Sequence, residues 1–323
     1  MPLINRIGWL FYYFKNRVIP FSWLAKLLNG KFHYYRSFMR ENVIETSIHF
    51  SSNIKKIENY GIWIVGSDQV WRSDFIKRNP TFYFLPFLPD NIRRKCISYA
   101  ASFGSASWNL DTQTTSQIKN LINGFEAVSV REKDGVLLCN NLFDIQSTLV
   151  PDPTILLYPH DYDNMIHRTI EQFPKDYEGK FIAYYILDMT PEKKKYLEMV
   201  QRRFGLKLIN MMHNTILDSK CILRRPIEQW LDIVKNAQLI VTDSFHGCVF
   251  SIIYNTKFIV LNNSQRGSSR FETLLSTLNL NELMIDEASL NFIPSSQINW
   301  KKVNETIDIM RKKGRNFIIE HVG

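Results

Sequence analysis

The sequence predicts an α/β protein with two domains, each built on a parallel sheet. From about residue 60 onward, short runs of β-branched and aromatic residues alternate with longer segments of helical periodicity, which is typical of βαβ units. The chain has 323 residues, of which 45% are hydrophobic, so it can bury more than one core, and two domains agree best with the pattern. No window of roughly twenty residues is both apolar and uncharged, so we expect no membrane-spanning helix.

Eight apolar runs are predicted strands, with helices between them. The strands of the first half are GIWIVG, KCISYA, AVSVR and STLV, and those of the second half are KFIAYYIL, LKLIN, AQLIVT and KFIVL. The predicted helices cover Thr112 to Asn123, Glu132 to Cys139, Pro191 to Phe204, Pro226 to Ala237 and Phe245 to Asn255. Each half of the chain therefore has the elements of its own α/β layer structure.

A polar segment from about residue 158 to 180 has no strand pattern and is predicted to connect the domains. We divide the chain into a helical, aromatic and basic amino-terminal segment (1–57), a first α/β domain (58–172), a second α/β domain (173–296) and a carboxyl-terminal helix (297–323). Apolar residues recur among charges from Asn299 to His321, and we interpret this pattern as a helix that returns to the first domain. Ligands of such folds bind beside the carboxyl ends of the strands.

The amino-terminal stretch INRIGWLFYYFKNRVIPFSWLAKLL is apolar and aromatic, but it is interrupted by four basic residues. It has neither the unbroken apolar run nor the cleavage site of a signal peptide. Two interpretations stay open. The stretch is a core or partner-docking helix, or residues 5–28 form a basic amphipathic segment in peripheral contact with an anionic membrane surface.

The net charge of +9 favours an acidic partner, but the basic residues are scattered and form no recognised nucleic-acid module, so we expect no nucleic-acid partner. The four cysteines are Cys96, Cys139, Cys221 and Cys248. They lie far apart in the sequence and form no Cys-x-x-Cys pair, which fits a reducing cytoplasm. No cluster of carboxylates or histidines has ligand spacing, so we expect neither a metal site nor a cofactor.

The run TDSFHG follows the predicted strand AQLIV and opens the next helix. Asp243 or Ser244 can cap that helix, whose first turn then favours an anion, and His246 lies beside this anion site. Gly247 lets another backbone approach. The alternative interpretation is that the carboxylate and hydroxyl only cap, and that His246 is a satisfied core histidine.

Three further strand ends carry polar or charged side chains. Arg266 and Arg270 follow the strand KFIVL, and arginine binds planar oxyanions through two parallel hydrogen bonds. Arg131 ends the strand AVSVR, where it can bind an anion or pair with Glu132. After GIWIVG come Asp68 and Gln69, whose side chains can form hydrogen bonds with a sugar, and Trp71, whose ring can lie flat against one. A tryptophan buried in the core would give the same sequence pattern.

Six stretches stand in a fixed order within roughly residues 58 to 285: IVGSDQVW, ISYAASFG, SVRE, VPDPTILL, PIEQWLDIVKNAQLIVTDSFHGCVFSII and NNSQRGSSR. Taken in this order, they resemble the polysaccharide pyruvyl transferase family. The resemblance implies two Rossmann-like domains that face each other across a cleft, a glycosyltransferase-B-like fold. It also implies transfer of pyruvate from phosphoenolpyruvate to two hydroxyls of a sugar, giving a cyclic ketal in a surface polysaccharide or its lipid-linked precursor.

The resemblance associates the residues at the positions of His246 and Arg131 with the donor, and we assign Ser244 and Phe245 to the same donor site. Asp152, in VPDPTILL, is assigned a capping role. Many relatives carry arginine where this chain has Ser244, so we expect Arg266 or Arg270 to supply the missing charge. Relatives also begin with a strand and an asparagine-glycine loop, which we expect this first domain to lack.

These residues predict a pyruvyltransferase in which His246 relays protons, Arg131 with Arg266 or Arg270 grips the donor anions, and the side chains at 68 and 69 orient acceptor hydroxyls. We expect it in the cytoplasm, including the inner face of the membrane. Two alternatives stay open: a nucleotide-sugar glycosyltransferase of polysaccharide biosynthesis, and a catalytically silent saccharide-binding relative.

Overall fold

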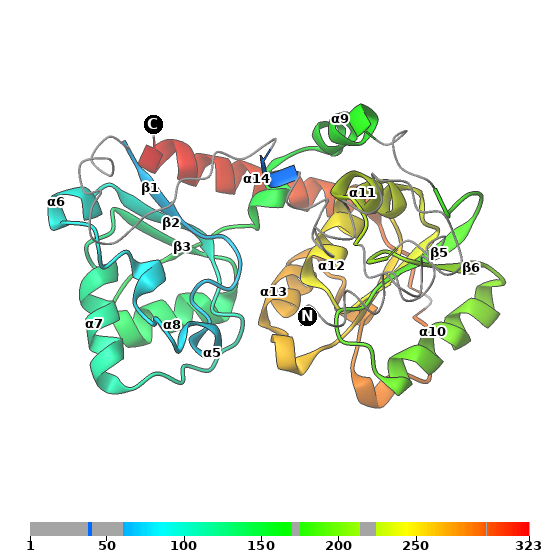
Figure 1. Ribbon diagram of the computed structural model, residues 1–323, viewed down its shortest axis with the longest axis horizontal. Helices are drawn as coiled ribbons and strands as arrows, with labels where there is room; N and C mark the ends of the chain where they lie inside the picture. The colour runs from blue at the N-terminus through cyan, green and yellow to red at the C-terminus, as the bar shows by residue number, and fades with distance from the viewer. Residues whose placement is uncertain (1–37, 41–60, 170–174, 214–223, 295, 323) are drawn as a thin grey trace, which may run out of the picture.

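The computed structural model describes residues 38–40, 61–169, 175–213, 224–294 and 296–322. They form a mixed α/β structure with two parallel sheets, one of four strands and one of five (Figure 1). The sheets contain a strand in each of the eight runs predicted from the sequence, so this part of the fold prediction is confirmed.

The four-stranded sheet has the order β1-β2-β3-β4, and every neighbouring pair is parallel. All six residues of β2 are buried, as expected for a strand covered on both faces. The strands are β1 (Trp63–Val65), β2 (Cys96–Ala101), β3 (Ala127–Val130) and β4 (Thr148–Leu149). The helices between Trp63 and Thr169 are α5 (Ser73–Ile76), η1 (Phe82–Phe84), α6 (Asp90–Arg93), α7 (Thr112–Ile122), α8 (Lys133–Phe143), η2 (Pro153–Leu156) and α9 (Pro159–Thr169).

The five-stranded sheet has the order β6-β5-β7-β8-β9 and is also parallel throughout. Its strands are β5 (Phe181–Tyr185), β6 (Lys207–Asn210), β7 (Leu239–Thr242), β8 (Phe258–Leu261) and β9 (Met284–Ile285). Its helices are α10 (Pro191–Phe204), α11 (Ile227–Asn236), α12 (Phe245–Ile253), η4 (Ser264–Arg266), α13 (Ser269–Leu278), η5 (Asn281–Leu283) and η6 (Glu287–Ser289).

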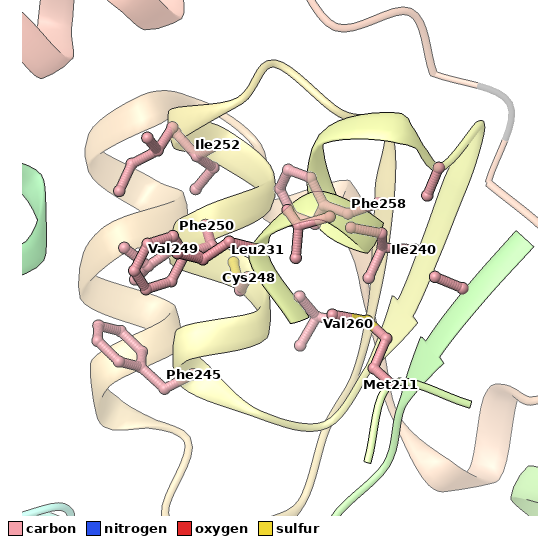
Figure 2. Close-up of a cluster of buried hydrophobic side chains, with 14 of the residues drawn as sticks. Met211, Leu231, Ile240, Phe245, Cys248, Val249, Phe250, Ile252, Phe258 and Val260 are labelled. Carbon is pink, nitrogen blue, oxygen red and sulfur yellow. The ribbon is translucent and has the colours of Figure 1, made fainter. Parts of the chain in front are cut away.

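The core of the second sheet holds α12 firmly in place. Figure 2 shows Cys248 and Val249 of α12 in one apolar cluster with Ile240, Phe258 and Val260 of the sheet. Eight of the nine residues of α12 are buried, and only His246 is left partly open. A helix that is apolar on nearly all sides gives its first turn a fixed position relative to the sheet.

Local chemistry explains why some helix bounds follow so closely from the sequence. Helix α10 begins after Thr190, whose side chain accepts a hydrogen bond from the backbone N–H of Lys193, and Pro191 occupies the first helical position. It ends at Gly205, which adopts a left-handed φ of 65°.

The carboxyl-terminal helix α14 (Trp300–Val322) contacts both parts of the molecule (Figure 1). Val303 and Ile307 belong to the core of the second sheet. Further along, Phe317 packs on Tyr99 of β2, with ring centres 6.2 Å apart. Arg311 donates to the backbone oxygens of residues 155 and 157.

Helix α9 and strand β9 are among the elements that the sequence analysis did not predict. The segment expected to be a polar connection contains helix α9, whose Tyr162 and Ile166 are buried in the core of the second sheet. The polar residues that suggested a connection lie on its other faces. Strand β9 has only two residues, Met284 and Ile285, and was missed because acidic residues closely flank its short apolar run, Glu282 before it and Asp286 after it.

The helical segment predicted for residues 1–57, the membrane contact of residues 5–28 and the missing first strand lie outside the described residues, apart from 38–40, which are helical. Among the helices that the structure describes, none combines the length and the apolar character that crossing a bilayer requires.

Candidate active site

A pocket of about 370 Å³ lies between residues that follow the strands of both sheets. From the part with the four-stranded sheet come Asp68, Gln69, Val70, Phe75, Ile76 and Tyr83. From the part with the five-stranded sheet come Leu187, Asp243 to His246, Arg266 and Arg270. The volume is within the range of about 300–1,000 Å³ that is usual for small-ligand sites.

His246 lies in the first turn of α12 and lines this pocket, with 39% of its side chain exposed. Ser244 is the residue that caps α12, because its Oγ accepts from the backbone N–H of Gly247 at 3.4 Å. Hence His246 is not a core histidine: it stands at the amino end of a helix, where anions are favoured.

Gly247 has a structural role that differs from the predicted one. A Cβ at this position would collide with the side chain of Thr242. The hydroxyl of Thr242 donates to the backbone oxygen of Tyr185 at 2.7 Å and accepts from the N–H of Ser244 at 3.0 Å. The glycine therefore accommodates a side chain, whereas the sequence analysis expected a second backbone.

Asp152 faces the imidazole from the first part of the molecule. Its Oδ2 lies 3.7 Å from Nε2 of His246, and only 1% of its side chain is exposed. Its other oxygen, Oδ1, accepts from the backbone N–H of Thr154 at 3.1 Å, so the predicted capping role, at η2, is present as well. Burial acts to raise the pKa of Asp152, but the nearby imidazole of His246 and the charge of Arg131 outweigh it and hold that pKa well below its usual range.

Arg131 is buried behind the pocket and does not line it. It forms ion pairs with Asp152 and, at 3.0 Å, with Asp68. The alternative that it pairs with Glu132 is wrong, because that carboxylate accepts from the backbone N–H groups of Phe103 at 2.6 Å and Gly104 at 3.1 Å. With both Nη atoms on carboxylates, Arg131 is placed to hold the partner of His246.

Arg270 is the buried cation that faces the pocket. Its Nη2 donates to the backbone oxygen of Arg266 at 3.1 Å, and its nearest carboxylate oxygen, on Asp68, is 3.8 Å from Nη1. Within the described residues its Nε has no hydrogen-bond partner. Burial, and then the charge of Arg131, lower the pKa of Arg270 to about 10. The positive charge here is incompletely compensated, so a bound anion would stabilise it.

Phe245 lies close to both buried guanidinium groups. The guanidinium carbon of Arg131 lies 4.6 Å from the centre of its ring, and that of Arg270 lies 5.3 Å away. Cations are attracted to the face of an aromatic ring, which eases the packing of two like charges close together.

Arg266 also lines the pocket, but it already has an anionic partner. It forms an ion pair with Asp188, in which Nη2 lies 2.9 Å from Oδ1. The hydrogen bond from Arg266 is the main reason that the pKa of Asp188 is lowered to about 2. Arg266 is 42% exposed at its side chain, so it can still reach a ligand.

Asp243 does not cap α12, contrary to the prediction. It is buried and accepts from Nζ of Lys193 at 2.8 Å and from the backbone N–H of Leu187 at 2.6 Å. The helix start is therefore capped by its neighbour, and Asp243 instead joins the loop after β5 to the loop after β7.

The predicted acceptor residues lie in different surroundings. Asp68 is exposed at the pocket between two arginines, and Nε2 of Gln69 donates to the backbone oxygen of Arg266 at 3.1 Å. The prediction that Trp71 offers a plate to a sugar is wrong, because the side chain is fully buried and stacks on Phe84 at 5.2 Å. The core alternative describes this tryptophan correctly.

A model of the polysaccharide pyruvyl transferase family matches residues 4–265, most of the chain. The chain belongs to the polysaccharide pyruvyl transferase family. A search of curated proteins returned no match. The family resemblance inferred from six short stretches is thus confirmed, and with it the prediction of a pyruvyltransferase enzyme.

Sequence reasoning missed two residues that shape the site of this pyruvyltransferase. Asp152 was assigned a cap and not a partner of His246, although its position after β4 was a usable signal. Lys193 stands in a run of three lysines, a pattern typical of an exposed surface, but it is 1% exposed. No group of three or more metal-ligating side chains occurs among the residues that the structure describes.

Proposed function

We propose that this enzyme transfers pyruvate from phosphoenolpyruvate to two hydroxyls of a sugar and forms a cyclic ketal. One observation carries the proposal. The partly exposed His246 and the incompletely compensated Arg270 line the same pocket, and the buried carboxylate of Asp152 lies next to the histidine. The acceptor is a surface polysaccharide or its lipid-linked precursor.

The two sheets are proposed to belong to two domains that face each other across a cleft, in a glycosyltransferase-B-like arrangement. Residues 58–172 would form the first domain and 173–296 the second, with α9 at the end of the first reaching into the core of the second and the helix of 297–323 packed back on the first. The composition of the pocket supports this division, because its walls come from segments far apart in the chain, such as Tyr83 and Arg266.

Phosphoenolpyruvate carries a phosphate and a carboxylate, and the pocket offers two sources of fixed positive potential for them. One is the amino end of α12, and the other is the pair Arg270 and Arg266. Arginine remains charged throughout the reaction, so these groups stabilise the anions without exchanging a proton. Arg270 supplies the charge that arginine provides in relatives at the position of Ser244, and Ser244 itself fixes the helix start.

Arg131 is proposed to act from behind the pocket. Since its Nη atoms bind Asp152 and Asp68, it orients the carboxylate beside His246 and adds positive potential at the donor site. Direct contact with the donor would require the exposed Asp68 to give up its ion pair. Arg131, which the resemblance assigns to the donor site, is thus proposed to act on the donor through its electrostatic potential and by positioning Asp152.

In the proposed reaction His246 gives a proton to the methylene carbon of phosphoenolpyruvate, which becomes a methyl group and leaves oxocarbenium character on the neighbouring carbon. A sugar hydroxyl bonds to that carbon and returns a proton to the imidazole. Phosphate leaves with the electrons of its C–O bond, the second hydroxyl closes the ketal, and its proton leaves with the phosphate. One hydroxyl proton therefore replaces the one given to carbon, and the other ends on phosphate.

Asp152 fits the role of the carboxylate that orients a catalytic imidazole. It is buried, anionic and next to Nε2, so it stabilises the imidazolium that forms whenever His246 holds the transferred proton. The other ring nitrogen is then the one that serves the substrate.

The test of this function is phosphate release from phosphoenolpyruvate in the presence of surface oligosaccharides. His246→Ala should lower the rate about a hundredfold to ten-thousandfold, the usual effect of removing a proton-transfer group. His160→Ala is the matched control, because this histidine is 73% exposed and does not line the pocket. Equal rates for the parent and His246→Ala would refute the assignment.

A second measurement separates this donor from a nucleotide sugar. Phosphoenolpyruvate should raise the midpoint temperature of thermal unfolding, since a ligand that binds only the folded state stabilises it. Protection by nucleotide sugars without protection by phosphoenolpyruvate would support a glycosyltransferase instead.

A further inference from the structure

Two exposed aromatic side chains form part of one wall of the pocket. Phe75 of α5 is 62% exposed and Tyr83 of η1 is 41% exposed, and both line the pocket. They come from the first part of the molecule, whereas His246 and Arg270 come from the second. Apolar rings left open in a concave site mark a surface that contacts a ligand.

The ring of Phe75 is held in place by a buried arginine. Arg72 donates to the backbone oxygens of Gln265 at 2.7 Å and of Arg266 at 2.8 Å, and its guanidinium carbon lies 4.5 Å from the centre of the Phe75 ring. A cation over one face of a ring restrains its orientation. Phe75 is therefore fixed relative to the segment that carries Arg266, although most of its own surface is open.

Tyr83 is fixed through its backbone. Nε1 of the buried Trp71 donates to the backbone oxygen of Tyr83 at 3.3 Å, and Phe84, the next residue, stacks on the same tryptophan. Thus Trp71 supports the aromatic wall from the core, and Tyr83 and Phe75 are the rings that the wall presents.

We propose that Phe75 and Tyr83 form the binding platform for the acceptor sugar. A pyranose ring has apolar C–H faces and a polar rim, so it can lie against aromatic rings while its hydroxyls point elsewhere. The charged donor is favoured near Arg270, which lines the same pocket from the other part of the molecule. A sugar on the platform would then share the pocket with the donor and with His246, to which it can present its hydroxyls.

The platform rests on the proposed function, because an acceptor sugar is required only if pyruvyl transfer takes place. Its test therefore measures sugar and donor separately. The sugar probes are the methyl glycosides of glucose, galactose and mannose, and their binding to the whole chain is followed by saturation-transfer NMR with and without phosphoenolpyruvate. Donor binding is measured by calorimetry with phosphoenolpyruvate alone.

Phe75→Ala and Tyr83→Ala should each weaken glycoside binding about tenfold, as expected when part of an aromatic contact is lost. Their affinity for phosphoenolpyruvate should stay within about twofold of the parent, since neither ring carries charge. Phe75→Tyr should restore glycoside binding, which a merely structural role for the ring would not explain.

The matched control is Phe292→Ala, because Phe292 is 51% exposed and does not line the pocket. The proposal is overturned if the parent binds none of the glycosides, or if Phe75→Ala and Tyr83→Ala bind them as tightly as the parent. If the glycosides bind through the platform but phosphoenolpyruvate does not bind at all, the platform stands and the proposed donor is wrong.

Discussion

Nζ of Lys193 donates a hydrogen bond to Oδ2 of Asp243 at 2.8 Å, and neither side chain has more than 1% of its surface exposed. The same carboxylate accepts from the backbone N–H groups of Leu187 and Asp188 and from the amide of Asn263. Asp188 in turn holds Arg266 at the pocket. One buried ion pair thus joins three loops that follow neighbouring strands of the second sheet.

Lys193→Met should lower the free energy of unfolding by about 3–5 kcal/mol, because it leaves the carboxylate of Asp243 buried without a counter-charge. The measurement is urea denaturation of the whole chain. Lys195→Met, at an exposed position of the same helix, should change the free energy of unfolding by less than about 0.5 kcal/mol. Adding Asp243→Asn to Lys193→Met should recover part of the loss, and a double variant no more stable than Lys193→Met would show that the ion pair is not the cause.

Arg270→Gln should weaken phosphoenolpyruvate binding about tenfold to a hundredfold, the effect of losing hydrogen bonds between charged groups. The free energy of unfolding should not fall. Burial and the neighbouring charge of Arg131 lower the pKa of Arg270 to about 10, which means that the charged guanidinium is less favourable in the folded protein than in the unfolded chain. Calorimetry gives the affinity and urea denaturation the stability. Arg202→Gln, in the last turn of α10, is the control, and undiminished donor affinity in Arg270→Gln would remove this residue from the donor site.

The pKa of Asp152 predicts how stability depends on pH. Burial acts to raise this pKa, but the nearby imidazole of His246 and the charge of Arg131 outweigh burial, so the folded-state pKa lies below the ordinary value of 3.8. The unfolded chain then binds more protons, and the stability from this carboxylate is complete above pH 3.8 and is lost as the pH falls through the lower folded-state pKa.

Asp152→Asn should therefore flatten the decline in the free energy of unfolding below about pH 4, since the amide has no proton to take up. Urea denaturation at a series of pH values between neutral and acid measures the decline. Asp90→Asn is the control, because its side chain is 98% exposed. Equal slopes for the parent and Asp152→Asn would mean that other carboxylates determine the acid sensitivity.

Much of the fold could be predicted because both sheets are parallel and covered by helices. Buried parallel strands such as β2 and β7 are continuous apolar runs, which are visible in a single sequence. Helix α9 was not predicted because its segment has many polar residues. Its buried residues, such as Tyr162 and Ile166, pack into the core of a sheet whose strands come later in the chain. Such long-range burial leaves no local pattern.

The candidate site was only partly predictable for a related reason. The rule that ligands bind beside strand ends located His246, Arg266 and Arg270, which all line the pocket. It could not show that Arg131 turns away onto two aspartates, or that Asp152 reaches the imidazole from the other sheet. The contacts of Arg131 depend on how the loops after β1, β3 and β4 pack against one another, and the contact of Asp152 with His246 depends on how the two parts pack together. No spacing along the chain encodes either.

Gly267 marks a close backbone approach between the two parts of the molecule. It has a left-handed φ of 84°, and a Cβ there would overlap the backbone oxygen of Gly104. Gly267→Ala should therefore both strain the backbone, by about 1–3 kcal/mol, and push apart the segments that carry Arg266 and Gln69. Gly205→Ala is the matched control, because Gly205 also has a left-handed φ, of 65°, but has no neighbouring atom within 4 Å of such a Cβ.

Urea denaturation should show a larger loss of stability for Gly267→Ala than for Gly205→Ala, and the difference measures the collision alone. Phosphoenolpyruvate affinity should fall in Gly267→Ala and stay unchanged in Gly205→Ala, because only the first substitution displaces a wall of the pocket. If both variants lose the same stability and bind the donor equally well, the close approach of Gly267 to Gly104 does not hold the pocket together.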